Sequence, residues 1–330
     1  MTLPEPANSP HDRLNDAFDP VTTEADIRAC FRLLLGRNPN PEERAGHFAQ
    51  AGAELGVVVK GYVNSHEFAS RGFLNERHEA SVEKVSGPGF DIFVQSDDLA
   101  VGHGVKAGSY EPHVTAVFKR FLKPGMSVLD IGANIGFFTM LSAHLVGPEG
   151  HVLAVEPNPA NARMIEASRR LNGFRHVTVL QVAAGRQPGI LALNVTHSNG
   201  TTAAVSEDLG GILGATTVPV INLDAVAPAA VDFIKIDVEG AEGAAIEGLE
   251  QTLTRCRPVI ASEFSPDMMS GISLCTGPDY LRFLNKHCYG ISVINHDGTV
   301  TDHGRNVEAV MEAYRRSGVD HIDILAQPQG

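Results

Sequence analysis

A stretch that reads VLDIGANIGFFTM, residues 128–140, contains the residue types that hold a nucleotide cofactor. It predicts a buried strand, a glycine-rich turn and the start of a helix. Ligands of parallel α/β sheets bind where strands end, and Gly132 and Gly136 stand at that point and allow a close approach of the backbone. The predicted cofactor cradle consists of Asp130, Gly132, Asn134 and Gly136.

The residues of this turn distinguish between cofactors. A dinucleotide-binding turn reads G-x-G-x-x-G, but Asn134 stands at the middle glycine and Phe137 at the third. Asp130 ends the strand, where a carboxylate would repel a pyrophosphate and attract an ammonium group. S-adenosylmethionine has an ammonium group, and a helix N-terminus can receive its carboxylate. The turn therefore favours S-adenosylmethionine over NAD, with a helix N-cap as the structural alternative for Asp130.

A second acidic residue supports an adenosyl cofactor. Glu156 ends the next predicted strand, 20 residues after Gly136. A carboxylate at that position hydrogen-bonds ribose hydroxyls in NAD sites and in S-adenosylmethionine sites alike. Glu156 therefore predicts ribose binding without choosing between the two cofactors. The alternative is a solvated residue at a strand end.

The stretch VDFIKIDVEGAEGAAIEGL, residues 231–249, contains the candidate catalytic residues. It predicts a strand that leads into a helix, with Lys235, Asp237 and Glu239 on one side. Charged residues at a strand end are costly unless they are paired or functional. We interpret Asp237 and Glu239 as functional. Lys235 could equally pair with Asp237, and Glu242 could equally complement the helix N-terminus.

Alternating strand and helix patterns around these stretches predict an α/β fold with a doubly wound, mostly parallel sheet. A helix is expected over Glu111–Leu122. Residues 190–222 contain further extended patterns, interpreted as an insertion near the ligand edge of the sheet. The expected strands are Ser127–Ile131, His151–Glu156, Val177–Val182, Val231–Asp237, Pro258–Phe264, Tyr289–Asn295 and His321–Ala326.

The N-terminal part of the chain shows helical patterns. Thr23 is expected to cap the first helix, Pro41 to begin the second, and the third to lie near Leu55–Asn64. The stretches DIFVQ and LAVGH predict a short hairpin further along. The predicted division is a flexible tail at 1–20, a helical domain at 21–80, a linker at 81–90 and an α/β domain at 91–330.

Composition limits the classes of partner and location. The chain has 330 residues, 43% of them hydrophobic, and a net charge of −13, which argues against a nucleic-acid or anionic-membrane partner. No apolar run is long enough to span a bilayer, and the N-terminus lacks the regions of a signal peptide, so we expect a cytoplasmic protein. The four cysteines and 14 histidines show no metal-binding spacing, and we expect reduced thiols and no metal site.

Several pieces of the sequence resemble one known family. GSYEPHV, VLDIGANIGFFTM, AVEPNP, NLDAV, DFIKIDVEGAE and RPVIASEF follow one another within residues 91–265. They resemble the FkbM-type family of S-adenosylmethionine-dependent methyltransferases. The resemblance implies a class I methyltransferase (Rossmann-like) sheet of seven strands, the last pair containing the one antiparallel strand. It also implies O-methylation of a saccharide or glycan precursor, or alternatively of a polyketide or other secondary metabolite.

The resemblance also implies roles for single residues. Tyr110 and Glu111 are expected near the methionine end of the cofactor, Ala184 at the adenine, and Asn199 facing the acceptor. A sugar hydroxyl needs a base, and Asp237 or Glu239 is the expected one. His103 and His197 are further possibilities, and His103 is also expected on the acceptor side. The two carboxylates could instead hold Mg²⁺, although no dedicated cage is evident.

A second resemblance concerns the N-terminal helices. LLGRNPNPEE and GYVNSHEF resemble a small helical domain, akin to a phycobilisome linker, that is found beside carbohydrate-processing enzymes. It suggests a protein partner for residues 21–80, whereas the alternative is a helical cap on the main domain. Two other functions stay open: a nicotinamide-dependent oxidoreductase on the same fold, and a non-catalytic scaffold.

Overall fold

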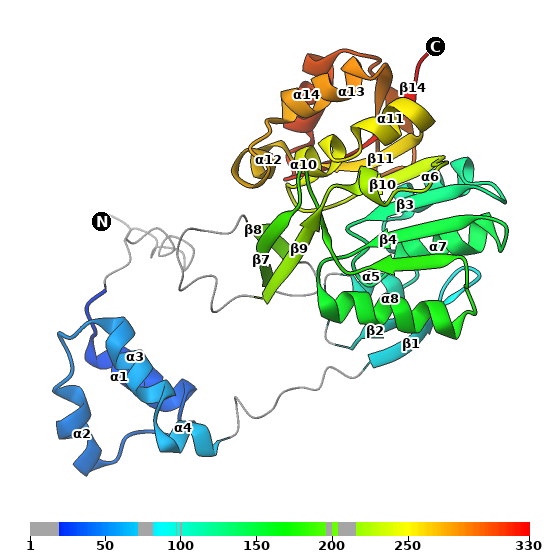
Figure 1. The fold of residues 1–330 in the computed structure, drawn as a ribbon. Coiled ribbons are helices and arrows are strands. Elements are labelled where there is room, and N and C mark those ends of the chain that lie inside the picture. Colours follow the sequence, from blue (N-terminus) through cyan, green and yellow to red (C-terminus); the bar gives the residue numbers. More distant parts are fainter. Residues whose placement is uncertain (1–19, 72–81, 97, 100, 196–199, 204–215) are drawn as a thin grey trace, which may run out of the picture. The chain divides into compact units, whose positions relative to one another are not determined.

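The computed structural model of this chain describes all residues except 1–19, 72–81, 97, 100, 196–199 and 204–215. The chain divides into two units, Met1–Glu79 and Ala80–Gly330 (Figure 1). Each unit has its own hydrophobic core. Among the described residues, no helix has both the length and the apolar character that crossing a membrane requires.

The N-terminal unit is built from short helices with clear start signals. The helices are α1 (Glu24–Leu33), α2 (Pro41–Phe48), α3 (Leu55–Val63) and α4 (His66–Ser70). Thr23 caps α1 as predicted, because its Oγ1 accepts from the Asp26 N–H (3.2 Å) while its own N–H donates to the Asp26 carboxylate (2.8 Å). Pro41 begins α2, directly after the N-cap Asn40.

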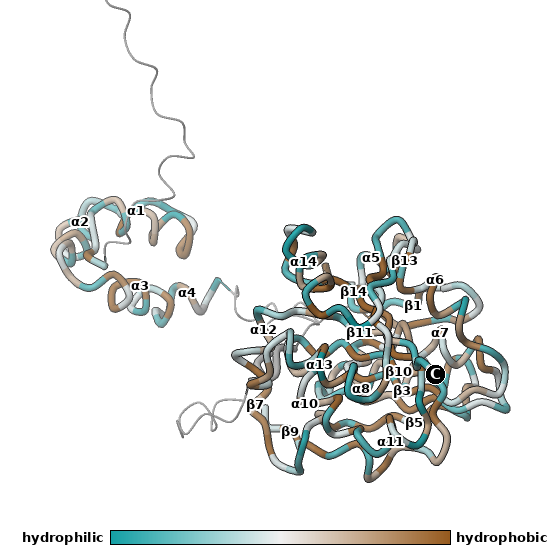
Figure 2. Tube along the Cα trace, turned by 90° about the horizontal axis from the view of Figure 1, so that it is seen from above, coloured by the Kyte–Doolittle hydropathy of each residue, from teal (hydrophilic) through white to brown (hydrophobic). Residues whose placement is uncertain are grey.

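Apolar side chains of these helices form the core of the unit. The core residues are Ile27, Cys30, Phe31, Leu35, Val58, Tyr62 and Phe68. Figure 2 shows hydrophobic and hydrophilic positions alternating along the helices, as expected for helices with one buried side. Outside the core, the Arg37 guanidinium binds Glu43 (2.7 Å) and Glu67 (2.6 Å) and so joins α2 to α4.

A large mixed sheet organises the second unit. In the described residues its strand order is β13-β12-β14-β11-β10-β3-β4-β5. The five strands from β11 to β5 are parallel, whereas β14 is antiparallel to both β11 and β12. The strands are β3 (Ser127–Ile131), β4 (His151–Val155), β5 (Val177–Leu180), β10 (Phe233–Ile236), β11 (Val259–Phe264), β12 (Tyr289–Ile294), β13 (Val300–Asp302) and β14 (Ile322–Pro328). All except β13 are predicted, and β14 is antiparallel as expected for the last pair. β13 adds an eighth strand that is antiparallel to β12 and was not expected.

Helices cover both faces of this sheet, and alternate residues of each strand point to opposite faces. Val128 and Phe233 pack on one face with α6 (Pro112–Phe121), α7 (Phe137–Val146) and α8 (Pro159–Leu171). Leu129 and Ile234 pack on the other face with a second group of helices. That group is α10 (Glu242–Glu247), α11 (Glu250–Cys256), α12 (Pro266–Ile272), α13 (Gly277–Lys286) and α14 (Val307–Ser317).

A hairpin precedes the sheet, and here the prediction was wrong. The expected linker at 81–90 contains β1 (Val82–Ser86), which pairs with β2 (Asp91–Gln95). The LAVGH stretch leads into the short helix α5 (Gly102–Lys106) and is not the partner of DIFVQ. The prediction failed because β1 is largely exposed and lacks the alternation of hydrophobic residues that identifies a strand.

The predicted insertion forms a second, smaller sheet. Its strands in the described residues are β6 (Ala183–Ala184), β7 (Gly189–Val195), β8 (Gly200–Ala203) and β9 (Thr216–Ile221), in the order β6-β9-β7-β8. A short 3₁₀ helix, η2 (Leu223–Ala225), follows. Because β6 begins shortly after β5 ends, the small sheet starts at the carboxyl edge of the large one.

Candidate active site

The glycine-rich turn after β3 forms a backbone cradle, and its glycines are required by geometry. Gly132 has φ +80°, and a Cβ on it would lie 1.7 Å from the Asp237 carbonyl oxygen. The Gly132 and Ala133 N–H groups donate to the Val155 carbonyl (2.9 and 3.1 Å), which ties the turn to β4. Gly136, with φ +94°, is the N-cap of α7. The turn therefore brings bare backbone to the edge of the sheet.

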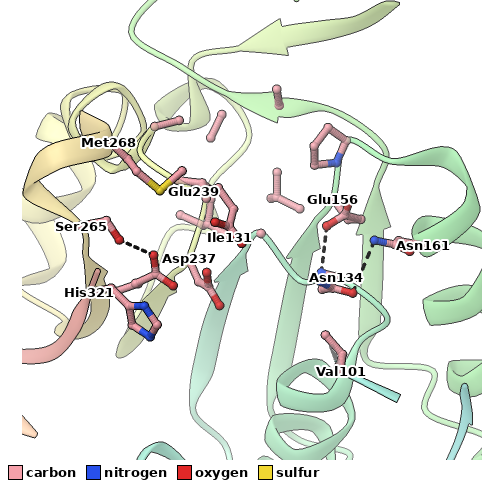
Figure 3. A pocket seen from close by; sticks show the side chains of 18 of the residues that line it. Val101, Ile131, Asn134, Glu156, Asn161, Asp237, Glu239, Ser265, Met268 and His321 are labelled. Carbon is pink, nitrogen blue, oxygen red and sulfur yellow. Dashed lines mark hydrogen bonds between the residues drawn. The ribbon is translucent and has the colours of Figure 1, made fainter. Parts of the chain in front are cut away.

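Glu156 follows β4 and holds this turn in place. Its Oε2 accepts from the Asn134 N–H (2.8 Å) and its Oε1 from the Asn158 N–H (2.7 Å). Figure 3 shows Glu156 beside Asn134, with Asn161 donating to the Asn134 side chain. Glu156 is only 5% exposed, and this burial raises the pKa of its carboxyl to about 7. Each carboxylate oxygen can accept more than one hydrogen bond, so both can still receive ligand hydroxyls.

Asp130 lies in β3, just before the cradle turn. It is fully buried, its Oδ2 accepts from Thr139 Oγ1 (2.5 Å), and its Oδ1 has no hydrogen-bond partner among the described residues. Burial raises the pKa of Asp130, an effect that Lys235, its register partner on β10, opposes. Asp130 does not line the cavity, so its predicted direct contact with the cofactor is not supported. The alternative of a helix N-cap is wrong too, because Gly136 has that position.

A partly buried ion pair marks the end of β10. Lys235 Nζ lies 2.7 Å from Asp237 Oδ2 and 4.8 Å from the centre of the Phe138 ring. Burial works against a charge on Lys235, but the carboxylates of Asp237, Glu111 and Asp130 raise its pKa. Burial also works against ionisation of Asp237, but Lys235 lowers the pKa of that carboxyl below its usual value. The predicted pairing of Lys235 with Asp237 is confirmed, and Asp237 stays ionised.

Glu239 has an unusual backbone for a non-glycine residue. Its φ is +51°, in the left-handed region, and its side chain is half-buried in the cavity. Burial and then the charge of Asp237 raise the pKa of the Glu239 carboxyl. Glu242 lies in the first turn of α10, and its Oε1 accepts from the N–H groups of Gly240 (3.0 Å) and Val238 (3.3 Å) in the turn that precedes this helix.

Tyr110 and Glu111 reach the cavity from the segment before α6. The Tyr110 ring packs against Phe137 and Phe138, with ring centres 5.2 and 5.9 Å apart. Glu111 has φ +36°, and burial raises the pKa of its carboxyl to about 7 even though Lys235 opposes the shift. Glu111, Asn134 and Glu239 are thus all in the left-handed region. Such strain concentrates at functional sites in proteins.

These side chains surround one cavity of about 290 Å³. Figure 3 shows Asp237, Ser265 and His321 on one side of it, the Asp237 side, and Asn134 and Glu156 on the other, the Glu156 side. The predicted residues that line it are Tyr110, Glu111, Gly132, Asn134, Glu156, Ala184, Asp237 and Glu239. The lining residues that were not predicted include Asn161, Glu263, Ser265, Met268, Asp320 and His321.

Strand direction explains two groups of missed residues. Glu263 and Ser265 lie at the end of β11, so the rule that ligands bind at strand ends could have found them. Asp320 and His321 precede β14, and because this strand is antiparallel, its beginning lies at the same edge. A search of strand ends alone cannot find such residues.

Some predicted residues are not brought to the cavity. His103 is exposed on α5 and does not line it, so its predicted role on the acceptor side is not supported. Gly136 shapes the backbone from the start of α7 without lining the cavity. Asn199 and His197 lie outside the described residues. Within the described part of the chain, no group of three His, Cys, Asp or Glu residues is arranged to hold a metal ion.

The Glu156 side fits an adenosyl cofactor. Gly132 lines the cavity with backbone alone, so a ligand can approach the backbone closely there. Glu156 offers carboxylate oxygens to ribose hydroxyls, and Ala184 adds a small apolar wall. The strand order, the antiparallel β14 and this cavity together define a class I S-adenosylmethionine-dependent methyltransferase fold.

Comparison with known families shows which methyltransferase family this domain matches. Residues 130–289 match the model of the Methyltransferase FkbM domain. The chain thus contains an FkbM-type S-adenosylmethionine-dependent methyltransferase domain, and the resemblance seen in the sequence is confirmed for this part. The match does not include the N-terminal helical unit, whose likeness to a phycobilisome linker stays a prediction.

Curated relatives share only part of the chain. It is 30% identical over 121 residues to the protein-L-isoaspartate O-methyltransferase of Methanothrix thermoacetophila, and 31% identical over 123 residues to that of Methanopyrus kandleri. These alignments cover 33% and 36% of this chain and 55% and 52% of those proteins. The chain therefore spans about half the length of the curated relatives it matches.

Solved structures give more distant similarities. A methyltransferase FkbM from Methylobacillus flagellatus has 16% identity and a TM-score of 0.39, over 64% of this chain and 50% of that one. A precorrin-6y C5,15-methyltransferase from Geobacter metallireducens has 17% identity and a TM-score of 0.37, over 67% and 89%. With TM-scores this low, neither similarity bears on the function of this chain.

Proposed function

We propose that this chain is an S-adenosylmethionine-dependent O-methyltransferase that acts on an uncharged hydroxyl of a saccharide or glycan precursor. One observation carries the proposal: the carboxylates of Asp237 and Glu239 open into the same cavity as the cradle and Glu156. A hydroxyl is a weak nucleophile, so a base must take its proton during transfer. These carboxylates supply a base beside the expected cofactor site.

The Glu156 side would hold the cofactor. Gly132 and Asn134 would receive its amino-acid part, Glu156 its ribose, and Ala184 its adenine. When bound, S-adenosylmethionine supplies an activated methyl group, which the acceptor oxygen receives as it loses its proton, and S-adenosylhomocysteine is left. The chain itself has to align the acceptor and exclude water from the cavity.

Glu239 is better suited than Asp237 to be the base. Lys235 keeps Asp237 ionised at a lowered pKa, and a carboxylate that is so stabilised accepts a proton poorly. Burial raises the pKa of Glu239, which brings its basicity closer to what a base needs at neutral pH. We therefore assign proton transfer to Glu239, and alignment of the acceptor hydroxyl to Asp237.

The charge of the cavity favours an uncharged acceptor. Its acidic lining residues are Glu111, Glu156, Asp237, Glu239, Glu263 and Asp320. Among the described lining residues, the one side chain that can become positive is His321, whose ring nitrogen already lies 2.8 Å from Asp320. A carboxylate acceptor would meet repulsion and no cation. The site therefore favours a hydroxyl over the isoaspartyl carboxylate that the names of the curated relatives indicate.

The choice of a saccharide depends on two weaker supports. Carboxylates and the Ser265 hydroxyl on the Asp237 side can accept hydrogen bonds from several hydroxyls of a polyol. The N-terminal unit resembles domains found beside carbohydrate-processing enzymes. A polyketide hydroxyl would need the same base and cofactor, so it is the alternative acceptor that an assay should include.

The test is a methylation assay with acceptors of different charge. The purified full chain and S-adenosylmethionine are incubated with neutral saccharides, with glucuronic acid, with polyketide alcohols and with an isoaspartyl peptide, and S-adenosylhomocysteine is measured. We expect product with neutral saccharides and a roughly 100-fold loss in Glu239→Gln. Glu308→Gln, whose side chain is 74% exposed on α14, is the matched control. Methylation of the peptide alone would overturn the proposal.

A further inference from the structure

Glu263, which the sequence reasoning missed, lies directly beside Asp237. The parallel register pairs Ile236 of β10 with Ser262 of β11, so the next residues of the two strands, Asp237 and Glu263, are neighbours at the edge of the sheet. Both side chains line the active-site cavity, and both also border a much smaller pocket of about 10 Å³ together with Lys235. Two carboxyl groups therefore meet at the reaction centre.

The position of this pair favours one proton between the two carboxyls. Glu263 Oε1 accepts from Ser265 Oγ (2.5 Å), and the Glu263 carboxyl borders the same small pocket as the Asp237 carboxyl. Two ionised carboxylates side by side repel each other, so the neutral form of one of them is favoured. Asp237 accepts from Lys235 Nζ (2.7 Å), which stabilises its ionised form. The proton consequently belongs on Glu263.

We propose that Glu263 is a positioning residue that works as an uncharged carboxylic acid. It donates a hydrogen bond to Asp237, and together with Lys235 it fixes the direction of the Asp237 carboxylate toward the acceptor. Ser265 holds the other Glu263 oxygen and so orients the donor. Neutral carboxylic acids that donate hydrogen bonds are an established way to build an active site. The use of this pair in turnover rests on the proposed function, but its protonation does not.

The surroundings of Glu263 favour the neutral form. Burial, followed by the charge of Asp237, raises the pKa of Glu263 to about 10, and the hydrogen bond from Ser265 only partly opposes this. The charged and titratable groups around it are Lys235, Asp237, Glu239 and Glu242 from β10 and the segment after it, Asp323 from β14, and Asp320 and His321 at the cavity. Acidic groups outnumber basic ones in this set.

Isosteric amides test the proposal, because the two carboxyls should respond in opposite ways. A glutamine at 263 can accept from Ser265 through its oxygen and donate to Asp237 through its nitrogen. Glu263→Gln should therefore keep turnover within about twofold of the wild type, whereas Glu263→Ala should lose about tenfold or more. Asp237→Asn should also lose at least about tenfold. A Glu263→Gln loss as large as that of Asp237→Asn would overturn the proposal.

Infrared spectroscopy of the full chain gives a readout that needs no acceptor. At about pH 8.5, groups with a pKa of about 7, namely Glu111, Glu156 and Glu242, are mostly ionised, whereas Glu263 still holds its proton. We expect a protonated-carboxyl band at this pH in the wild type and in Glu239→Gln, and its loss in Glu263→Gln.

The two readouts separate this inference from the proposed function. If a band that Glu263→Gln removes is present but no acceptor is methylated, the acid pair stands and the proposed function fails. If methylation occurs but the wild type shows no such band, the pair is overturned and the methyltransferase remains. Because the infrared measurement needs only the wild type to give a first answer, a variant that folds poorly does not remove the test.

Discussion

At the scale of single residues, Glu239 combines a strained backbone with a buried acid. A left-handed conformation costs a non-glycine residue about 1–2 kcal/mol relative to glycine. Glu239 has this conformation, with φ +51°, in spite of its free-energy cost, and its side chain lines the cavity. We infer that function, rather than stability, keeps a glutamate at this position.

Replacement by glycine separates these two contributions. Glu239→Gly should raise the free energy of unfolding, by up to about 1–2 kcal/mol, because it relieves the strain. It should also lower turnover roughly 100-fold or more, because it removes the proposed base. Chemical denaturation and S-adenosylhomocysteine formation measure the two effects. A variant that is less stable than Glu239→Gln, or as active as the wild type, would contradict this account.

Glu156 leads to a prediction about pH. Its pKa is about 7 in the folded chain but near 4.5 when unfolded, so the folded state holds the proton more tightly between these values. The stability that Glu156 contributes is therefore full below about pH 4.5 and is lost as the pH rises through 7. Relative to Glu156→Gln, the wild type should lose about 2–3 kcal/mol of unfolding free energy between about pH 5 and 8.

Cofactor binding should change with pH in the opposite direction. Ionised Glu156 accepts ribose hydroxyls better than the neutral acid does, so the affinity for S-adenosylhomocysteine should rise as the pH passes through about 7. Calorimetric titration at several pH values measures this. Glu156→Gln should bind more weakly, and the slope of its affinity with pH should be smaller. Equal slopes in both proteins would remove Glu156 from ribose binding, and binding of NAD alone would support the oxidoreductase alternative.

At the scale of elements, the turn between β3 and α7 is where sequence reasoning succeeded best. The buried strand, its two glycines and the following helix are local features, so they leave a clear pattern in the sequence. Gly132 is required because a Cβ would overlap the Asp237 carbonyl oxygen, a contact between segments far apart in the sequence. The sequence indicates the glycine, whereas only the structure shows which atom excludes a side chain.

Gly132→Ala tests this contact, and Gly173→Ala is its matched control. Gly173 also has a positive φ, +66°, but nothing lies within 4 Å of a Cβ there. Gly173→Ala should therefore cost only the backbone strain, about 1–2 kcal/mol. Gly132→Ala should cost about 1–3 kcal/mol more through overpacking, and it should abolish cofactor binding. Thermal unfolding and calorimetric titration compare them; similar losses in both variants would contradict the assigned contact.

Elements that depend on distant partners were harder to predict. β1 has charged, exposed residues, and it is a strand because β2 supplies its hydrogen bonds. Asn172 at the end of α8 then fixes this hairpin, because its side chain both accepts from the Asp91 N–H (2.8 Å) and donates to the Asp91 carbonyl (2.6 Å). Neither the pairing with β2 nor the contact with Asn172 produces a periodic pattern of residues in the sequence. The position of Glu263 at a strand end is visible in the sequence, whereas its closeness to Asp237 depends on the register with β10.

At the scale of the whole molecule, the separate cores predict independent stability of the methyltransferase unit. The N-terminal core contains Ile27, Phe31 and Tyr62 from its own helices, whereas the cores of Ala80–Gly330 use residues of that unit. A chain of residues 80–330 should therefore unfold cooperatively and bind S-adenosylhomocysteine with the affinity of the full chain. Calorimetry measures both properties. Loss of binding in the shorter chain would show that the helical unit contributes to the site.

If the truncated chain binds normally, the helical unit is free to serve another purpose. We propose for it the protein partner that the linker-like sequence suggests. Comparing methylation of a short saccharide with that of a long glycan, by the full and the truncated chain without other proteins, separates a protein partner from direct recruitment of the acceptor. A deficit of the truncated chain on the long glycan alone would favour recruitment of large acceptors by this unit.

The position of β14 has a consequence for biosynthesis. This strand follows all the others along the chain, yet it lies between β11 and β12 in the sheet and brings His321 to the cavity. Until residues 322–328 are made and form β14, β12 cannot hydrogen-bond to the rest of the sheet. The wall of the cavity near His321 is then also incomplete. Both edges of this gap expose unpaired backbone groups. A polypeptide in which β14 has not yet entered the sheet can therefore pair through these edges with other copies of itself, and rapid insertion of β14 protects it from aggregation.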